Sequence, residues 1–169
     1  SYVGTKYAVA CMNGTVGLQI SLIVSGIQES DYVLVPNLTF VASLNAIKHT
    51  GADPILIDVN QSNWQIDLNV LENFLKTNTT QKFINKTKFC VLNEDGRIIK
   101  CVMPVHVLGN MCDMEHLKSI AKNYSLLIIE DSTEALGSFF NQRHAGTFGN
   151  LGVFSFNGNK IISTGGGGL

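Results

Sequence analysis

The stretch Phe154-Ser155-Phe156-Asn157-Gly158-Asn159-Lys160 ends on a single lysine and follows a short apolar run that begins at Leu151. The residues around this lysine are apolar or small and neutral, and four glycines follow at 165–168. Loss of solvation lowers the pKa of an amine toward the range in which the free base forms imines. A lone lysine at a strand end is more often an ordinary surface residue, so this interpretation depends on partners elsewhere in the chain.

Outward from this stretch, short apolar runs alternate with segments of helical periodicity, which predicts an α/β protein whose mostly parallel sheet is sandwiched by helices. Segments 89–92 and 98–102 are expected to form a hairpin, and 76–88 a surface connection. The expected strands are 7–11, 32–35, 54–58, 89–92, 98–102, 126–129 and 151–156, and the expected helices are 16–25, 39–49, 67–75 and 113–122.

The composition limits the classes of function. The 169 residues are 45% hydrophobic and 15% charged with a formal net charge of −1, which is typical of a folded domain and implies neither a nucleic-acid nor a membrane partner. The first residues lack a signal-peptide pattern, so the cytoplasm is expected. The four cysteines favour reduced buried thiols over disulfides or metal ligands. Both ends look cut, so residues 1–169 are expected to be an incomplete domain.

Three segments that follow expected strands are candidates for one binding pocket, because ligands of parallel sheets gather at the carboxyl ends of the strands. Asn13-Gly14-Thr15 lies where a strand is expected to turn into a helix, so its backbone N–H groups and hydroxyl suit a phosphate. An ordinary helix cap explains the same residues equally well. Ser155, five positions before Lys160, could offer the same anion a second hydroxyl.

Asp131 ends the most apolar expected strand, where a carboxylate is costly unless something pairs with it. A protonated pyridine nitrogen would be such a partner, and the pairing would keep a pyridoxal ring electron-poor. A helix cap is the ordinary alternative. Phe40 could stack on an aromatic ring or belong to the core. His106 could pair with Asp131, line the pocket or be a structural histidine.

Together these segments resemble the DegT/DnrJ/EryC1/StrS family of pyridoxal-phosphate sugar aminotransferases. The matching pieces occur in the family's order and span nearly the whole chain. They are Asn13-Gly14-Thr15, Val35-Pro36-Asn37-Leu38-Thr39-Phe40-Val41-Ala42, Gly51-Ala52-Asp53-Pro54, Pro104-Val105-His106, Asp113-Met114, Ile129-Glu130-Asp131-Ser132-Thr133-Glu134-Ala135 and the stretch from Phe154 to Lys160 with its glycine tail.

The resemblance implies the large domain of a fold type I, aspartate-aminotransferase-like enzyme, usually a homodimer, that lacks here its preceding segment and C-terminal domain. It assigns Lys160 as the imine-forming lysine and Asp131 as the partner of the pyridine nitrogen of pyridoxal 5′-phosphate. Gly14, Thr15 and Ser155 become phosphate contacts, and Phe40 the residue stacked on the ring.

The position near the ring hydroxyl, commonly Gln or His in the family, corresponds to Glu134. This departure and the stretch before Lys160 resemble the branch that makes UDP-linked 4-amino sugars of the bacillosamine and legionaminic acid type. The implied reaction moves an amino group from glutamate to a 4-keto nucleotide sugar, with Lys160 shuttling a proton. Two alternatives stay open: a sugar dehydratase of the same family, in which histidine replaces the lysine, and a catalytically silent scaffold.

Overall fold

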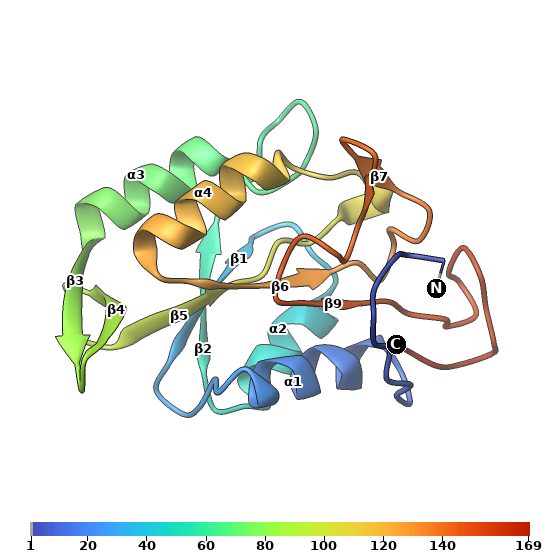
Figure 1. Ribbon diagram of the computed structural model, residues 1–169, viewed down its shortest axis with the longest axis horizontal. Helices are drawn as coiled ribbons and strands as arrows, with labels where there is room; N and C mark the ends of the chain where they lie inside the picture. Colours follow the sequence, from blue (N-terminus) through green and yellow to red (C-terminus); the bar gives the residue numbers. More distant parts are fainter. Residues whose placement is uncertain (1) are drawn as a thin grey trace.

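A parallel sheet runs through the centre of the protein, with helices on both of its faces (Figure 1). The computed structural model describes residues 2–169. The helices are α1 (Gly14–Val24), α2 (Val41–Lys48), α3 (Leu68–Asn78) and α4 (Met114–Tyr124), with a short 3₁₀ turn η1 (Val107–Gly109). The strands are β1 (Tyr32–Pro36), β2 (Asp53–Ile57), β3 (Thr79–Ile84), β4 (Thr87–Leu92), β5 (Ile98–Val102), β6 (Leu127–Asp131), β7 (Phe139–Phe140), β8 (Arg143–His144) and β9 (Leu151–Val153).

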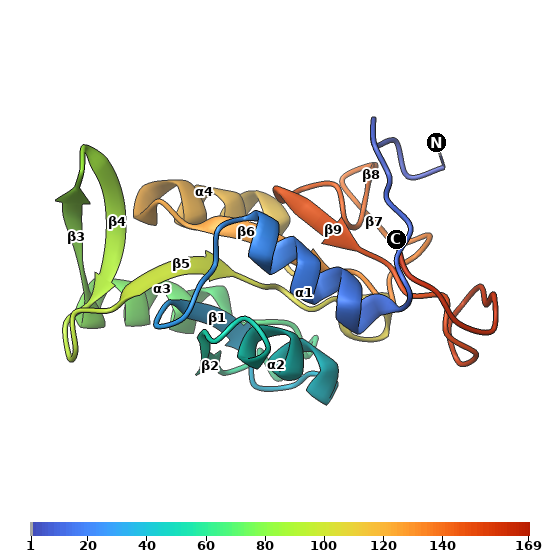
Figure 2. The same cartoon turned by 90° about the horizontal axis from the view of Figure 1, so that it is seen from below.

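Five of these strands, in the order β2-β1-β5-β6-β9, are all parallel to one another. The hairpin β3-β4 joins this sheet through β4, which pairs antiparallel with the first residues of β5. The last residues of β5 pair with β6. The expected α/β class and the mostly parallel sheet are therefore confirmed. Figure 2 shows that the hairpin projects at one end of the sheet, away from α1 and α2.

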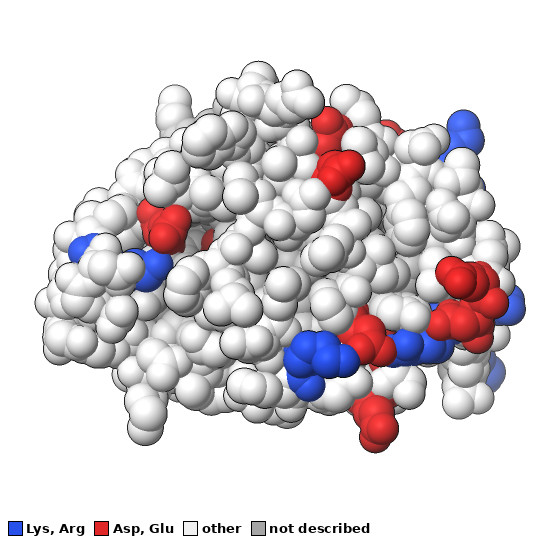
Figure 3. Space-filling model, turned by 180° about the vertical axis from the view of Figure 1, so that it is seen from behind, with Lys and Arg blue, Asp and Glu red and all other residues white. Residues whose placement is uncertain are grey.

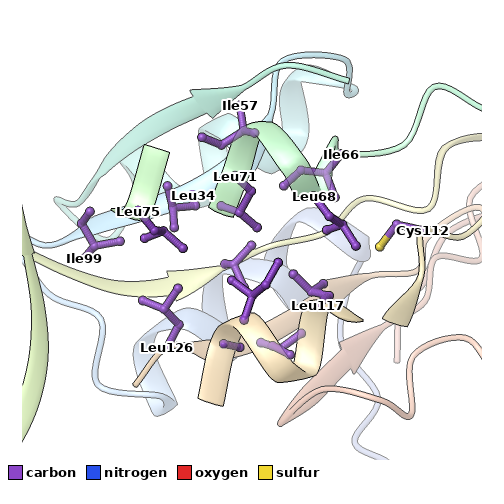
Figure 4. Packing of buried hydrophobic residues seen from close by; sticks show 14 of the residues in the cluster. Leu34, Ile57, Ile66, Leu68, Leu71, Leu75, Ile99, Cys112, Leu117 and Leu126 are labelled. Atoms are coloured by element: carbon purple, nitrogen blue, oxygen red, sulfur yellow. The ribbon is translucent and has the colours of Figure 1, made fainter. Parts of the chain in front are cut away.

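Successive side chains along the strands point to opposite faces of the sheet and pack into two separate hydrophobic cores. On β1, Leu34 points into the core beneath α3 and α4, whereas Val33 and Val35 point into the core beneath α1 and α2. On β6, Ile128 and Ile129 divide between the same two cores. Figure 4 shows the first core, where leucines and isoleucines of α3 and α4 interleave over the sheet. Burial of both faces explains why these strands read as nearly continuous apolar runs.

Local sequence signals place the helix starts. The side-chain oxygens of Asn13, Asp67 and Asp113 accept hydrogen bonds from backbone N–H groups in the first turns of α1, α3 and α4. Each cap satisfies donors that a helix start otherwise leaves free. The helices expected at 67–75 and 113–122 are confirmed, and so is the hairpin of β4 and β5.

Three expectations about strands are wrong. Residues 7–11 form no strand: Tyr7 and Val9 are exposed, and pairing is limited to a bridge between Cys11 and Gly168. Segment 76–88 is more than a surface connection, because α3 continues to Asn78 and the rest builds β3 and the start of β4. The strand expected at 151–156 ends at Val153. In each case the available backbone partners, rather than local composition, decide whether a ladder forms.

The buried residues include three of the four cysteines, Cys90, Cys101 and Cys112, and all four are free thiols. Burial raises the pKa of Cys101 and of Cys112 to about 12. Within residues 2–169, none of the helices has the length and apolar character that crossing a membrane requires.

Candidate active site

A cavity of about 350 Å³ opens at the carboxyl ends of the parallel strands. Its walls come from the start of α1 and from the segments that follow β1, β5, β6 and β9. All seven residues that the sequence singles out line it: Gly14, Thr15, Phe40, Asp131, Glu134, Ser155 and Lys160. The structure thus brings together residues that lie far apart in the chain.

Asp131 is buried at the floor of the site, at the last position of β6. Its Oδ2 accepts a 2.6 Å hydrogen bond from the Ser43 hydroxyl, and its Oδ1 accepts from the Thr133 hydroxyl at 2.8 Å and the Thr133 N–H at 3.2 Å. No helix starts after Asp131, so the helix-cap alternative is wrong. Within residues 2–169 this carboxylate has no basic side chain as an ion-pair partner.

Lys160 reaches the cavity from the loop that follows β9, and its side chain is only 15% exposed. Its Nζ lies 3.2 Å from Oε1 of Glu134. The local sequence suggested a neutral environment for this amine. The fold instead supplies a carboxylate from a segment 26 positions away.

Glu134 is held by two contacts, since its Oε2 also accepts a 3.0 Å hydrogen bond from the Leu108 N–H. Partial burial raises the pKa of Glu134, but the Leu108 N–H and the Lys160 ammonium together outweigh that effect and leave the pKa below its ordinary value. Leu108 has a φ of 54°, a backbone conformation uncommon outside glycine, and this conformation accompanies the N–H contact with the carboxylate.

Gly14 begins α1 at the wall where the sequence predicts phosphate contacts. A Cβ at this position would lie 2.9 Å from Cγ2 of Thr133 and 3.0 Å from Cβ of Ser155. Only glycine therefore fits against these two side chains without displacing them. The N-terminus of α1, with hydroxyls from Thr15 and Ser155 beside it, is an arrangement that suits an anion.

Phe40 and His106 occupy different environments. Phe40 precedes α2, lines the cavity and is 76% exposed, so it is not a core residue. His106 also lines the cavity but is buried, and its Nε2 lies 2.9 Å from Oε2 of Glu130. Of the three alternatives that the sequence left open for His106, pairing with the Asp131 side chain is wrong, because only the His106 backbone N–H contacts Asp131, at its carbonyl oxygen.

Sequence reasoning missed Ser43, Thr133 and Glu130. Thr133 had a local signal, because an aspartate followed two positions later by threonine often closes a small side-chain turn. Ser43 had none, since 88 positions separate it from the carboxylate that it contacts. Glu130 is adjacent to Asp131 in the sequence, and only the fold shows which of the two carboxylates faces the cavity.

Comparison with known proteins places these features in a wider group. Residues 1–169 match the DegT/DnrJ/EryC1/StrS aminotransferase family. GDP-perosamine synthase of Escherichia coli O157:H7 is 43% identical over 164 residues, which cover 97% of this chain and 40% of that protein. The chain thus spans about two fifths of the length of this curated relative.

Solved structures show the same arrangement of elements. A DegT DnrJ EryC1 StrS aminotransferase from Brucella abortus superposes with a TM-score of 0.85 at 29% identity, covering 99% of this chain and 42% of that one. The Streptococcus pneumoniae protein Spr1654 in its PLP form superposes with a TM-score of 0.80 at 25% identity, covering 99% and 41%. The fold is therefore that of the aminotransferases in this group.

Proposed function

This chain belongs to the DegT/DnrJ/EryC1/StrS aminotransferase family, and from that premise we propose that the protein is a pyridoxal-phosphate-dependent aminotransferase. It moves an amino group from glutamate to a 4-keto nucleotide sugar for the synthesis of a surface polysaccharide or glycan. The observation that carries the proposal is the meeting of Lys160, Asp131 and the Gly14 turn around one cavity.

The residues of the cavity fit the cofactor in two respects. Asp131 is a buried carboxylate that has no basic partner within residues 2–169, and a protonated pyridine nitrogen would supply the missing cation. Gly14 stands at a helix N-terminus beside the hydroxyls of Thr15 and Ser155 in the cavity wall, which suits a phosphate group. The cavity thus offers both a buried carboxylate and a wall that suits an anion, the two kinds of group that such a molecule needs.

When bound, pyridoxal phosphate supplies an aldehyde that condenses with amines and an electron-poor ring that stabilises negative charge on the adjacent carbon. In the cavity, the Lys160 amine would hold the cofactor and would move a proton at the reacting carbon. Asp131 holds a proton on the ring nitrogen, and Ser43 and Thr133 keep its two oxygens in place. Phe40 and Glu134 also line the cavity, where Phe40 would cover the ring face and Glu134 would face the ring hydroxyl.

The nucleotide of the sugar substrate is the least constrained part of the proposal. Glu134 and the stretch before Lys160 favour a UDP-linked substrate through the family resemblance, whereas the relative that is 43% identical is a GDP-perosamine synthase. Both nucleotides therefore belong in the assay. Lys160 argues against a dehydratase, because that reaction type in the family uses histidine at this position.

Two measurements on the full-length protein test the proposal. Borohydride reduction in the presence of pyridoxal phosphate should fix the cofactor covalently on the peptide that carries Lys160. Lys160→Ala should abolish the labelling, and Lys118→Ala, a change of an exposed lysine on α4, should leave it intact. Labelling at another lysine would contradict the proposed role of Lys160. No labelling in the wild type would favour the silent scaffold.

Turnover assays then identify the reaction. The protein loaded with cofactor should release 2-oxoglutarate from glutamate and afterwards aminate a 4-keto sugar linked to UDP or to GDP. Loss of the sugar hydroxyl without amination would indicate a dehydratase instead. We further propose a cytoplasmic homodimer, which fractionation and light scattering of the full-length protein can check.

A further inference from the structure

A chain of two hydroxyl groups joins Asp131 to the loop between β1 and α2. The Ser43 hydroxyl on α2 donates to Oδ2 of Asp131 at 2.6 Å, and Oγ of Ser43 lies 2.7 Å from Oγ1 of Thr39. Asp131 and Thr39 both line the cavity, whereas Ser43 is fully buried and does not line it. The carboxylate and the loop are thus connected through one buried serine.

The donors in this chain follow from the number of protons that each group carries. Asp131 as a carboxylate only accepts hydrogen bonds, and a serine hydroxyl has a single proton to donate. Ser43 gives that proton to Asp131, so its oxygen accepts in the contact with Thr39, and Thr39 is the donor. The carbonyl oxygen of Phe40 is the more distant acceptor for the same proton, at 3.2 Å. The chain therefore runs from Thr39 through Ser43 to Asp131.

The Thr39 hydroxyl also ties the loop that carries Phe40 to the rest of the site. Phe40 precedes α2, is 76% exposed and gives this helix no side-chain cap. Among the side chains at 38–40, only that of Thr39 makes a hydrogen bond within residues 2–169. Its partner Ser43 is the residue that contacts Asp131. Thr39 is therefore the side chain that links the position of Phe40 to that of the carboxylate.

We propose that Thr39 is a positioning residue whose hydroxyl orients Ser43 toward Asp131 and holds the loop that carries Phe40 against the same site. The assignment rests on the proposed function, since it concerns how this cavity holds pyridoxal phosphate. In that function Asp131 contacts the ring nitrogen and Phe40 covers the ring face. Thr39 acts on both contacts through Ser43, because hydroxyls in a hydrogen-bonded chain fix and polarise one another.

Two substitutions at Thr39 isolate the contribution of the hydroxyl. Thr39→Val keeps the shape of the side chain but removes the donor, so Ser43 loses the hydrogen bond that orients it. Thr39→Ser keeps the donor and removes only a methyl group. The matched control is Thr50→Val. Thr50 lies just beyond the other end of α2, and its hydroxyl donates to the Ile47 carbonyl oxygen at 2.7 Å, away from the residues that line the cavity.

The experiment uses the full-length protein and measures the dissociation constant of pyridoxal phosphate, the visible circular dichroism of the bound cofactor and the melting temperature. The circular dichroism reports how the ring is held. We expect Thr39→Val to weaken cofactor binding about fivefold, the effect of one lost hydrogen bond between neutral groups, and to change the circular dichroism at saturating cofactor. Thr39→Ser should keep the affinity and spectrum of the wild type. Thr50→Val should lower the melting temperature alone.

A double variant with Ser43→Ala decides whether Thr39 acts through Ser43. If it does, Thr39→Val adds little to the loss of cofactor affinity already caused by Ser43→Ala, because the chain is then broken beside Asp131. Losses that multiply would overturn the assignment. Wild-type affinity and circular dichroism in Thr39→Val, or an equal loss in Thr39→Ser, would also overturn it, even if Ser43→Ala fails to fold. A wild-type protein that binds no pyridoxal phosphate would overturn the proposed function itself, which is a distinguishable result.

Discussion

The charged side chains at the two ends of the parallel strands, called here the amino-end edge and the carboxyl-end edge of the sheet, have different partners. At the amino ends of the strands, Arg97 donates to Asp53 at 2.6 Å and to the Tyr32 hydroxyl at 2.9 Å, and Lys48 pairs with the same aspartate at 2.5 Å. Figure 3 shows basic and acidic side chains alternating in a row along the lower part of the rear face. At the carboxyl ends, Asp131 has only hydroxyl and N–H partners within residues 2–169.

This difference shows what each edge contributes. The charges at the amino ends pair with one another and stabilise the fold, and none of them lines the cavity. A buried carboxylate held by neutral donors keeps its charge available, at a cost to stability that a cationic ligand can offset. We therefore expect substitutions at the amino-end edge to change stability, and those at the carboxyl-end edge to change cofactor binding and turnover.

The largest expected effect is on turnover in Asp131→Asn. An asparagine can keep contacts with Ser43 and Thr133 but cannot support a proton on the ring nitrogen, so turnover should fall at least about 100-fold while cofactor remains bound. Steady-state rates and cofactor absorbance of the full-length protein check this. The matched control, Asp53→Asn at the other edge, should keep full turnover, and unchanged turnover in Asp131→Asn would refute the role.

Gly14→Ala should have the next largest effect. Its methyl group would press on Thr133 at 2.9 Å and on Ser155 at 3.0 Å and would displace the Ser155 side chain assigned to the phosphate, so the affinity for pyridoxal phosphate should fall about tenfold. Gly17→Ala is the control on the same helix, because its Cβ would crowd Val153 at 2.8 Å instead of the cavity. That variant should lose stability alone, and equal loss of affinity in both would contradict the phosphate assignment.

At the amino-end edge, Arg97→Met should lower the free energy of unfolding by about 1–2 kcal/mol. The substitution removes the contacts with Asp53 and Tyr32, including the stacking of the guanidinium 3.9 Å from the tyrosine ring centre. Urea unfolding of the full-length protein measures the change. Cofactor affinity should stay within twofold of the wild type, and a larger change would show that the two edges are coupled.

The smallest expected effect is the acid sensitivity that Glu134 confers. Its pKa is lowered from 4.5, so its contribution to stability is present above that value and is lost as the pH falls through the lower pKa of the folded state. The side chain is 38% exposed, so the contribution should be below about 1 kcal/mol. Unfolding at pH 7 and pH 3 should show a steeper loss for the wild type than for Glu134→Gln.

The exposed pair of Lys118 and Glu115 provides a control for this last prediction. Glu115→Gln should alter acid stability less than Glu134→Gln does, because its pair lies on the surface of α4, where solvent screens it. If both variants lose the same acid sensitivity, the contact between Lys160 and Glu134 contributes no more to acid stability than an exposed surface pair does.

Much of the fold could be predicted because it depends on local patterns. Asp67 and Asp113 cap helices whose N–H groups lie two or three positions away, and apolar runs identify strands that are buried on both faces. Residues 7–11 and 79–84 could not be predicted in this way. Whether they form strands depends on backbone partners that composition does not reveal.

The sequence by itself determined the α/β class, most of the helices and parallel strands, and seven of the residues that line the cavity. Only the tertiary structure decided that Glu134 lies against Lys160, that Ser43 holds Asp131 and that Glu130 rather than Asp131 is the partner of His106. The physical reason is the sequence separation over which each kind of interaction acts. Periodicity and capping act over a few residues, whereas these contacts join side chains 24 to 88 positions apart, and only the packing of the sheet edge brings them within hydrogen-bond distance.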